Sequence, residues 1–261
     1  MNTGSCPPSI SFRSIHRLIQ SVLPQLTFSF HRHQSINADF SGGQITSDAG
    51  LVPLRAFDQR HHLTSDLAQL LSDPRQDDRV HHDSLALLRQ RLYQIVAGYE
   101  DTNDADRLRH DPLLQIVADQ KLGHALGSQP TLSRWENAPV ARDLVRLNDA
   151  LLDQFVRLCG EPVRQRGEIL LDIDSTDDPT HGQQQLSFFN GGYGQHMYHP
   201  MLVFERHTGC LLAARLRPGN ASSHARDRAH AAALGTAFAG GLPGSEDQAA
   251  RRCWLRPAAA L

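Results

Sequence analysis

The spacing of apolar residues changes from a helical to a strand pattern near Gly160. From Ser47 up to that glycine, apolar residues recur at helical intervals. After it, Glu168 to Asp174, Met201 to Arg206 and Cys210 to Arg217 are typical of strands. A short glycine-containing connection joins the last two as an antiparallel hairpin. Helices followed by antiparallel strands predict an α+β fold.

The helical part divides into several predicted helices. The first takes Ser47 or Asp48 as its N-cap and ends near His61. A longer helix ends near Gly98, and the last one ends at Gly160. We expect the longer helix to bury one apolar face, formed by Leu85, Leu88, Leu92, Ile95 and Val96.

Composition excludes several classes of protein. Hydrophobic residues make up 40% and charged residues 21% of the 261 residues, which is typical of a globular chain and not of a disordered one. No apolar run approaches the ~20 residues of a membrane-spanning helix. The net charge of −2 does not indicate a nucleic-acid-binding protein by bulk electrostatics. Four cysteines without CxxC or zinc-ligand spacing suit a reducing cytosol, so we expect a cytoplasmic protein.

Four carboxylates gather at the end of the first predicted strand, in the segment Leu171 to Asp178, with no basic residue between them. Strand alternation places Leu171 and Ile173 on one face and Asp172 and Asp174 on the other. A divalent cation such as Mg²⁺, bound by oxygen ligands, would offset the repulsion between the carboxylates. The alternative is a solvated turn beyond the strand end, and spacing alone does not decide between the two.

A second candidate is the segment Gly127 to Asn137, where Thr131 is a plausible cap of a short helix. This helix would present Ser133, Arg134 and Asn137 to DNA phosphates and bases. The alternative is structural, because a tryptophan such as Trp135 more often anchors a core.

Two other kinds of site are not supported. The pairs His61-His62 and His81-His82 are sequence neighbours, which diverge on a helix instead of converging on a metal. Gly191 to Gly194 lacks the strand-to-helix context of a phosphate-binding loop. Zinc and nucleotide chemistry are therefore not expected.

Six segments in order resemble the bacterial insertion-sequence transposases that carry a group-1 DDE domain. The resemblance covers about residues 37 to 222. The segments are Asp39 to Gly50, Gly98 to Pro112, Ser128 to Asn137, Leu171 to Asp178, Phe188 to Gly194 and Arg215 to Asn220.

This resemblance implies a ribonuclease-H-like core in which three acids hold two Mg²⁺ ions. The acid on the first strand corresponds to Asp174, and Asp172 becomes a neighbour with an open role, a weaker candidate for a metal ligand. Two such ions activate a water or a 3′-hydroxyl and stabilise the leaving oxygen at phosphorus. The implied partners are DNA with terminal inverted repeats and further copies of the chain in a homo-oligomer.

The sequence also departs from the family. After the Arg-Pro-Gly-Asn turn the family continues into a fourth strand with an Ala-Asp-Ser-Gly-Phe-like segment, and nothing in residues 221–261 corresponds to it. We find neither the second nor the third catalytic acid. A frameshift or early stop would explain this, leaving an incomplete ribonuclease-H-like domain of three antiparallel strands whose first strand has an uncovered edge.

The predicted organisation is therefore a loosely ordered extension (1–36), a helical region that contacts DNA ends (37–160), a partial DDE domain (161–220) and an alanine-rich, out-of-frame tail (221–261). The leading hypothesis is a DDE transposase by descent, truncated and unable to cleave or join DNA alone. The alternatives are a non-catalytic DNA-binding regulator of transposition and an unrelated hydrolase that uses the acids Asp172 to Asp178.

Overall fold

The computed structural model describes residues 25–39, 45–75, 80–182 and 184–221, and these fall into two compact units that divide between Pro139 and Val140. The first unit contains strands β1 (Leu26–Phe28) and β2 (Ile36–Ala38) and helices α2 (Leu51–His61), α3 (Leu63–Ala68), α4 (Ser84–Val96), η2 (Thr102–Asp104), α5 (Ala105–Leu108), α6 (Pro112–Val117) and α7 (Gln129–Glu136). The second contains α8 (Ala141–Arg166), β3 (Leu171–Ser175), β4 (Asp178–Pro179), β5 (Phe188–Asn190), β6 (Gln195–Tyr198), β7 (Met201–Glu205) and β8 (Cys210–Arg215). The mixture of helix and sheet agrees with the predicted α+β class.

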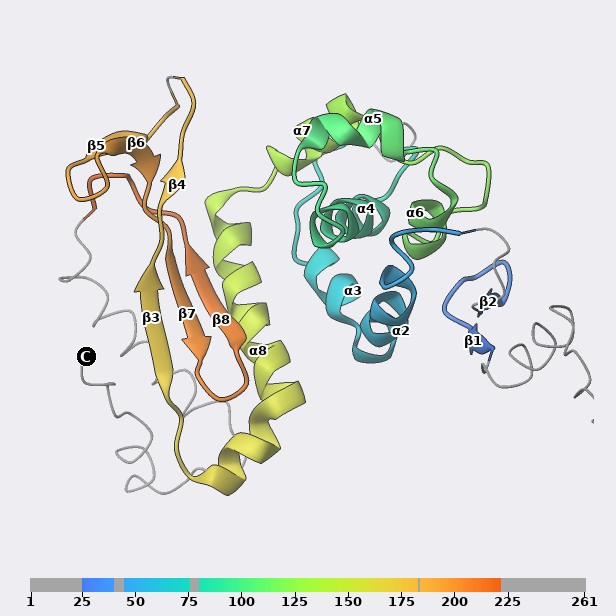
Figure 1. The fold of residues 1–261 in the computed structure, drawn as a ribbon, viewed down its shortest axis with the longest axis horizontal. Helices are drawn as coiled ribbons and strands as arrows, with labels where there is room; N and C mark the ends of the chain where they lie inside the picture. The colour runs from blue at the N-terminus through green and yellow to red at the C-terminus, as the bar shows by residue number, and fades with distance from the viewer. Residues whose placement is uncertain (1–24, 40–44, 76–79, 183, 222–261) are drawn as a thin grey trace, which may run out of the picture. The chain divides into compact units, whose positions relative to one another are not determined.

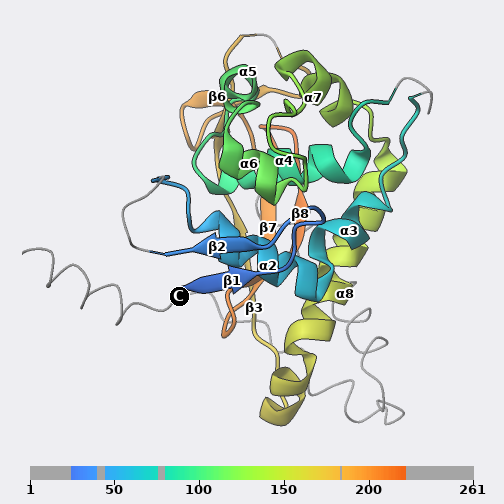
Figure 2. The same ribbon diagram turned by 90° about the vertical axis from the view of Figure 1, so that its right-hand side faces the viewer.

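Part of the segment predicted to be a loosely ordered extension (1–36) forms a strand pair. Strands β1 and β2 pair antiparallel (Figure 2). Phe30 and Ile36 are buried in the same core as Tyr93 and Leu114 of the helices. Their apolar side chains explain why this segment is held on the unit. Residues 1–24 lie outside the described residues, as do residues 222–261, on which most of the predicted tail falls.

Helix α4 has the predicted length but not the predicted buried face. The side chain of Asp83 caps its start, and Gly98, with φ of 89°, follows its end. Leu92, Ile95 and Val96 are 37%, 44% and 55% exposed. The buried face consists instead of Ala86, Leu87, Arg89, Gln90, Tyr93 and Gln94.

Polar residues occupy the buried face of α4 because distant parts of the chain satisfy them. The amide of Gln90 donates to the Gly127 carbonyl at 2.8 Å and accepts from the Gly127 N–H at 2.9 Å. Both hydrogen-bonding groups of this buried side chain therefore have a partner, which removes most of the cost of burying them. Apolar periodicity does not predict such a face, because its polar side chains can be buried only through hydrogen bonds to distant parts of the chain.

A buried charge network joins α2, α3 and α4 around Asp58. The Asp58 carboxylate accepts hydrogen bonds from the Thr64 N–H (2.7 Å), the Thr64 hydroxyl (2.6 Å) and the Tyr93 hydroxyl (2.8 Å). The guanidinium groups of Arg55 and Arg89 each lie 3.6 Å from the same carboxylate oxygen. All five residues are buried.

Helix α2 itself begins after Gly50, without a side-chain cap from Ser47 or Asp48, because Asp48 contributes its carbonyl to the first turn.

The second unit is built on an antiparallel sheet in the order β3-β7-β8, as predicted for the three strands. Residues 206–209 form the predicted turn of the β7–β8 hairpin. Within the described residues, β3 pairs with β7 alone, so its other edge carries no strand there. A second small sheet, β4-β6-β5, was not predicted, because strands of two to four residues are too short to show alternation.

Helix α8 covers the β3-β7-β8 sheet and runs along β8 (Figure 1). We expected it to end at Gly160, but it continues through Pro162 to Arg166 and ends at Gly167, with φ of 73°. Burial of Phe155 and Val163 against Leu212 of the sheet offsets the unfavourable glycine and proline. Because α8 packs on the sheet, it belongs to the second compact unit, which begins at Val140.

The turn end of the β7–β8 hairpin holds a fully buried acid, Glu205. It pairs with Arg166 at 3.2 Å and accepts from the Thr208 N–H at 2.8 Å. Burial raises the pKa of Glu205, but the hydrogen bonds from Thr208 and His207 and the charge of Arg166 outweigh it and lower the pKa overall.

Within the described residues, no helix has the length and apolarity needed to span a membrane.

Candidate functional site

Asp174 lies on the solvent face of β3, as strand alternation predicts. Leu171, Ile173 and Ser175 are half-buried, whereas Asp172 and Asp174 are exposed. The Asp174 carboxylate accepts a hydrogen bond from the Ser175 N–H at 2.8 Å. The rest of the carboxylate is open to a ligand or to water.

A hollow of about 480 Å³ lies beside Asp174. It is lined by Asp174, Ser175, Phe189, Asn190, Gly191, Gly192, Tyr193, His199, Asn220 and Ala221. Three of the six segments singled out in the sequence meet here: Leu171 to Asp178, Phe188 to Gly194 and Arg215 to Asn220. The three segments could be recognised in the sequence, but their position around one acid, Asp174, could not be predicted from it.

Asn190 and Gly219 hold the wall of this hollow together through a hydrogen bond and a close backbone contact. The Asn190 amide donates to the Gly219 carbonyl at 2.8 Å and accepts from the Gly192 N–H at 2.9 Å. A Cβ atom at Gly219 would lie 2.1 Å from the Met197 carbonyl oxygen and 2.4 Å from that of Phe188. Only glycine allows the chain after β8 to pass this close to β5 and β6.

His199 is a lining residue that sequence reasoning missed. Its side chain is 4% exposed, and its Nδ1 lies 3.0 Å from the Ala221 carbonyl oxygen. A carbonyl only accepts, so Nδ1 carries a proton, and in the neutral ring Nε2 presents a lone pair. That buried Nε2 has no hydrogen-bond partner among the residues the structure describes. No local motif marks this histidine, because its hydrogen-bond partner Ala221 and the acid Asp174 of the same hollow come from distant parts of the chain.

The other acids of the cluster point elsewhere. Asp172 does not line the hollow and lies 3.9 Å from the Arg206 guanidinium. Asp177 accepts a hydrogen bond from Gln195 at 2.9 Å, and Asp178 begins β4. Among residues 25–39, 45–75, 80–182 and 184–221, no three histidine, cysteine or acidic side chains gather to hold a metal ion. The four acids are thus spread over β3, the short connection that contains Asp177, and β4.

Helix α7 presents the second group of predicted residues. Arg134 and Asn137 are exposed, and Ser133 is half-buried. The Asn137 amide donates to the Ser133 carbonyl at 2.7 Å and so closes the helix end. The helix begins after Ser128 and not at Thr131, whose hydroxyl lies 3.0 Å from that of Ser128. Trp135 packs with Leu87 and Leu132, as the structural interpretation expected.

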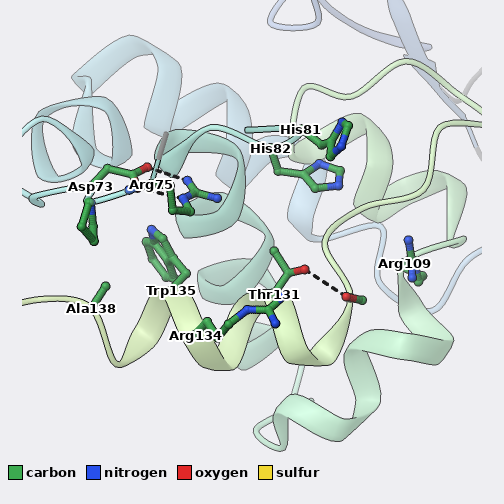
Figure 3. Close-up of a pocket in the computed structure, with 11 residues that line it drawn as sticks. Asp73, Arg75, His81, His82, Arg109, Thr131, Arg134, Trp135 and Ala138 are labelled. Carbon is green, nitrogen blue, oxygen red and sulfur yellow. Dashed lines mark hydrogen bonds and ion pairs between the residues drawn. The ribbon is translucent and has the colours of Figure 1, made fainter. Parts of the chain in front are cut away.

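Arg134 lines a second hollow, of about 580 Å³, within the helical unit (Figure 3). Its walls carry several basic side chains and are separate in sequence from those of the Asp174 hollow. The structure therefore offers an acid-bearing hollow in one unit and a basic hollow in the other.

Comparison with known proteins gives one family match. A family model described as transposase DDE domain group 1 matches residues 28–245. The matched range begins before and ends after the 37 to 222 spanned by the six segments, and it includes part of the segment predicted to be a foreign tail. No curated protein and no solved structure shows significant similarity to the chain.

Proposed function

The chain belongs to the family of transposases with a group 1 DDE domain, and we propose that it acts on DNA ends through the hollow beside Asp174. The supporting observation is that three family-like segments, distant in sequence, line this one hollow. Asp174 is then the first acid of the site. The chemistry of the family is cleavage and joining of phosphodiester bonds with divalent metal ions.

The donors at this site are of the kind that Mg²⁺ prefers. The Asp174 carboxylate and the Asn220 side-chain carbonyl are hard oxygen ligands on residues that line one hollow. A bound Mg²⁺ would supply charge stabilisation at the phosphoryl oxygens. Of the described lining residues Asp174 is the one acid, so they provide one wall of a metal site and not a full ligand set.

His199 fits this function as a positioning residue. In the neutral ring its Nε2 lone pair is a hydrogen-bond acceptor, suited to a water or to a sugar hydroxyl. The proton on Nδ1, held by the Ala221 carbonyl, fixes the ring in the orientation that keeps this lone pair available.

Our proposal includes catalytic incompleteness of this chain when it is alone. The support is that residues 221–261 contain no counterpart of the Ala-Asp-Ser-Gly-Phe-like segment that carries the second acid in the family. One acid does not arrange two metal ions. We expect the purified chain to bind duplex DNA carrying its inverted repeats, with affinity that falls steeply with salt, and to leave the strands uncut in Mg²⁺ or Mn²⁺.

The experiment has two separate readouts. Binding that is absent or insensitive to salt contradicts the assignment to DNA. Cleavage that disappears in Asp174→Asn contradicts incompleteness while supporting Asp174 as a catalytic acid. Cleavage that survives in Asp174→Asn shows that the nuclease activity belongs to another site or another protein.

A second candidate is a non-catalytic regulator that occupies transposon ends or pairs with intact transposase. It is favoured by the combination of one acid in the Asp174 hollow and several cations in the helical hollow. Addition of this chain to an intact relative should lower the rate of transposition. An unchanged rate over a wide excess of this chain would rule the regulator out.

A further inference from the structure

The hollow in the helical unit is built from three stretches of chain. The segment before α4 supplies Arg75, His81 and His82, the end of α5 supplies Arg109, and α7 supplies Arg134 and Trp135. In Figure 3 the histidines and Arg75 lie across the hollow from α7, and Arg109 lies at one end of it. Nitrogen-bearing side chains thus surround the space from several directions.

The acid in this wall is already neutralised. Of the described lining residues Asp73 is the only carboxylate. Arg75 donates to both of its oxygens, at 2.8 and 2.6 Å, and the Ser84 hydroxyl donates at 2.8 Å. The Arg75 hydrogen bonds hold the pKa of Asp73 well below its usual range. Asp73 therefore balances Arg75 and leaves the other cations of the hollow uncompensated.

Arg109 and Arg134 form no ion pair within the part of the chain that the structure describes. The Nε atom of Arg109 is buried and lacks a hydrogen-bond partner there. An unpaired buried donor on a cation is costly to leave unsatisfied. A ligand with several acceptor oxygens would remove that cost.

His82 reports the positive field of the hollow. Burial lowers the pKa of this half-buried histidine, and the charges of Arg109, His81 and Arg75 lower it further, against an opposing effect of Asp83. Asp83 itself caps α4, where its carboxylate accepts from the Ala86 N–H at 2.7 Å. Entry of an anion would counter the arginine charges and raise the pKa of His82.

The neutral donors fit an anion as well. The hydroxyls of Ser128 and Thr131 lie 3.0 Å apart, so one donates to the other and the second keeps its hydrogen for a ligand. Both hydroxyls are at the start of α7, where the helix dipole favours negative charge. Arginine and hydroxyl donors together are the usual contacts of a phosphate group.

We propose that this hollow binds a backbone phosphate of DNA, with Arg109 and Arg134 as its ionic contacts and the Ser128–Thr131 hydroxyl pair as its neutral donor. The assignment of the phosphate to DNA rests on the proposed function. Free inorganic phosphate has the same chemistry, and the experiment below separates the two sources.

The test uses the full chain and three variants, Arg109→Gln, Arg134→Gln and the control Arg107→Gln. Arg107 has an exposed side chain, pairs with Asp104 at 3.5 Å and does not line the hollow. Binding to duplex DNA is measured over a range of salt. We expect each of the first two variants to lose about tenfold in affinity and to lower the slope of log Kd against log salt by about 1, because each removes one phosphate contact. The control Arg107→Gln should change both the affinity and the salt slope by less than these amounts.

The His82 imidazole signals, followed by NMR against pH, give the second readout. We expect the pKa of His82 to rise when DNA is added. If the wild-type chain binds DNA but both variants bind as tightly and His82 does not respond, the hollow is not the contact and the proposal fails while the function stands. If inorganic phosphate moves His82 and DNA neither binds nor moves it, the hollow takes small phosphates and both the DNA contact and the proposed function fail.

Discussion

The buried network around Asp58 makes a sharp prediction for Asp58→Asn. The substitution keeps the size of the side chain but removes the charge that two buried guanidinium groups face at 3.6 Å. Removing one partner of a buried ion pair costs about 3 to 5 kcal/mol. Arg89 keeps a second carboxylate, Asp119, at 3.9 Å. Among the described residues, Arg55 keeps its contact with the Phe30 ring, 5.3 Å from the ring centroid, and no second carboxylate. We therefore expect a loss near the lower end, about 3 to 4 kcal/mol.

The measurement is urea unfolding followed by tryptophan fluorescence. The chain has two tryptophans, Trp135 and Trp254, so a Trp254→Phe background leaves Trp135, which is buried in the helical unit, as the reporter. Asp104→Asn, at a partly exposed pair, is the control and should change stability by less than about 1 kcal/mol.

Adding Arg55→Met to Asp58→Asn should restore part of the loss, because it removes the buried cation that the first substitution leaves without its carboxylate partner. A loss below about 1 kcal/mol in Asp58→Asn, with an unchanged m-value, would refute the view that this carboxylate balances buried charge. A further loss of stability when Arg55→Met is added to Asp58→Asn would also refute this view.

Three further predictions concern the second unit. Gly219→Ala should destabilise it by about 1 to 3 kcal/mol in thermal unfolding, since the new methyl group meets backbone oxygens that cannot move aside, whereas Gly191→Ala, with nothing within 4 Å, should not. Because folding lowers the pKa of Glu205, its carboxylate stabilises the unit fully above the pKa of an unfolded glutamate, about 4.3. This stabilisation is lost as the pH falls through the lower pKa of the folded state. Glu205→Gln should abolish this acid-dependent part of the unfolding free energy. Asn148→Ala should cost about 1 kcal/mol in urea unfolding, because the Asn148 side chain on α8 accepts from the Ala214 N–H of β8 at 2.9 Å.

Local patterns in the sequence predicted the elements whose cause is local. Pro112 begins α6, the glycine after α4 stops that helix, and the turn before Cys210 closes the β7–β8 hairpin. The alternation around Asp174 also held, because β3 has one face on the core and one in solvent.

Contacts between distant residues explain what sequence reasoning missed. Gln90 is buried on α4 because Gly127 satisfies it, and α8 continues past Gly160 because the sheet packs against Val163. His199 and Arg109 carry no local signal at all. Each becomes notable only through what the folded chain places around it or leaves unpaired there.

The lock between Asn190 and Gly219 has a consequence for synthesis on the ribosome. Asp174 emerges first, then the Asn190 loop, and only later the Gly219 turn and the carbonyl that orients His199. A nascent chain that stopped between these points would display the acid on a bare strand, without the surroundings that distinguish it from any other surface aspartate. The hollow can thus be completed only after residues 219 to 221 have been translated.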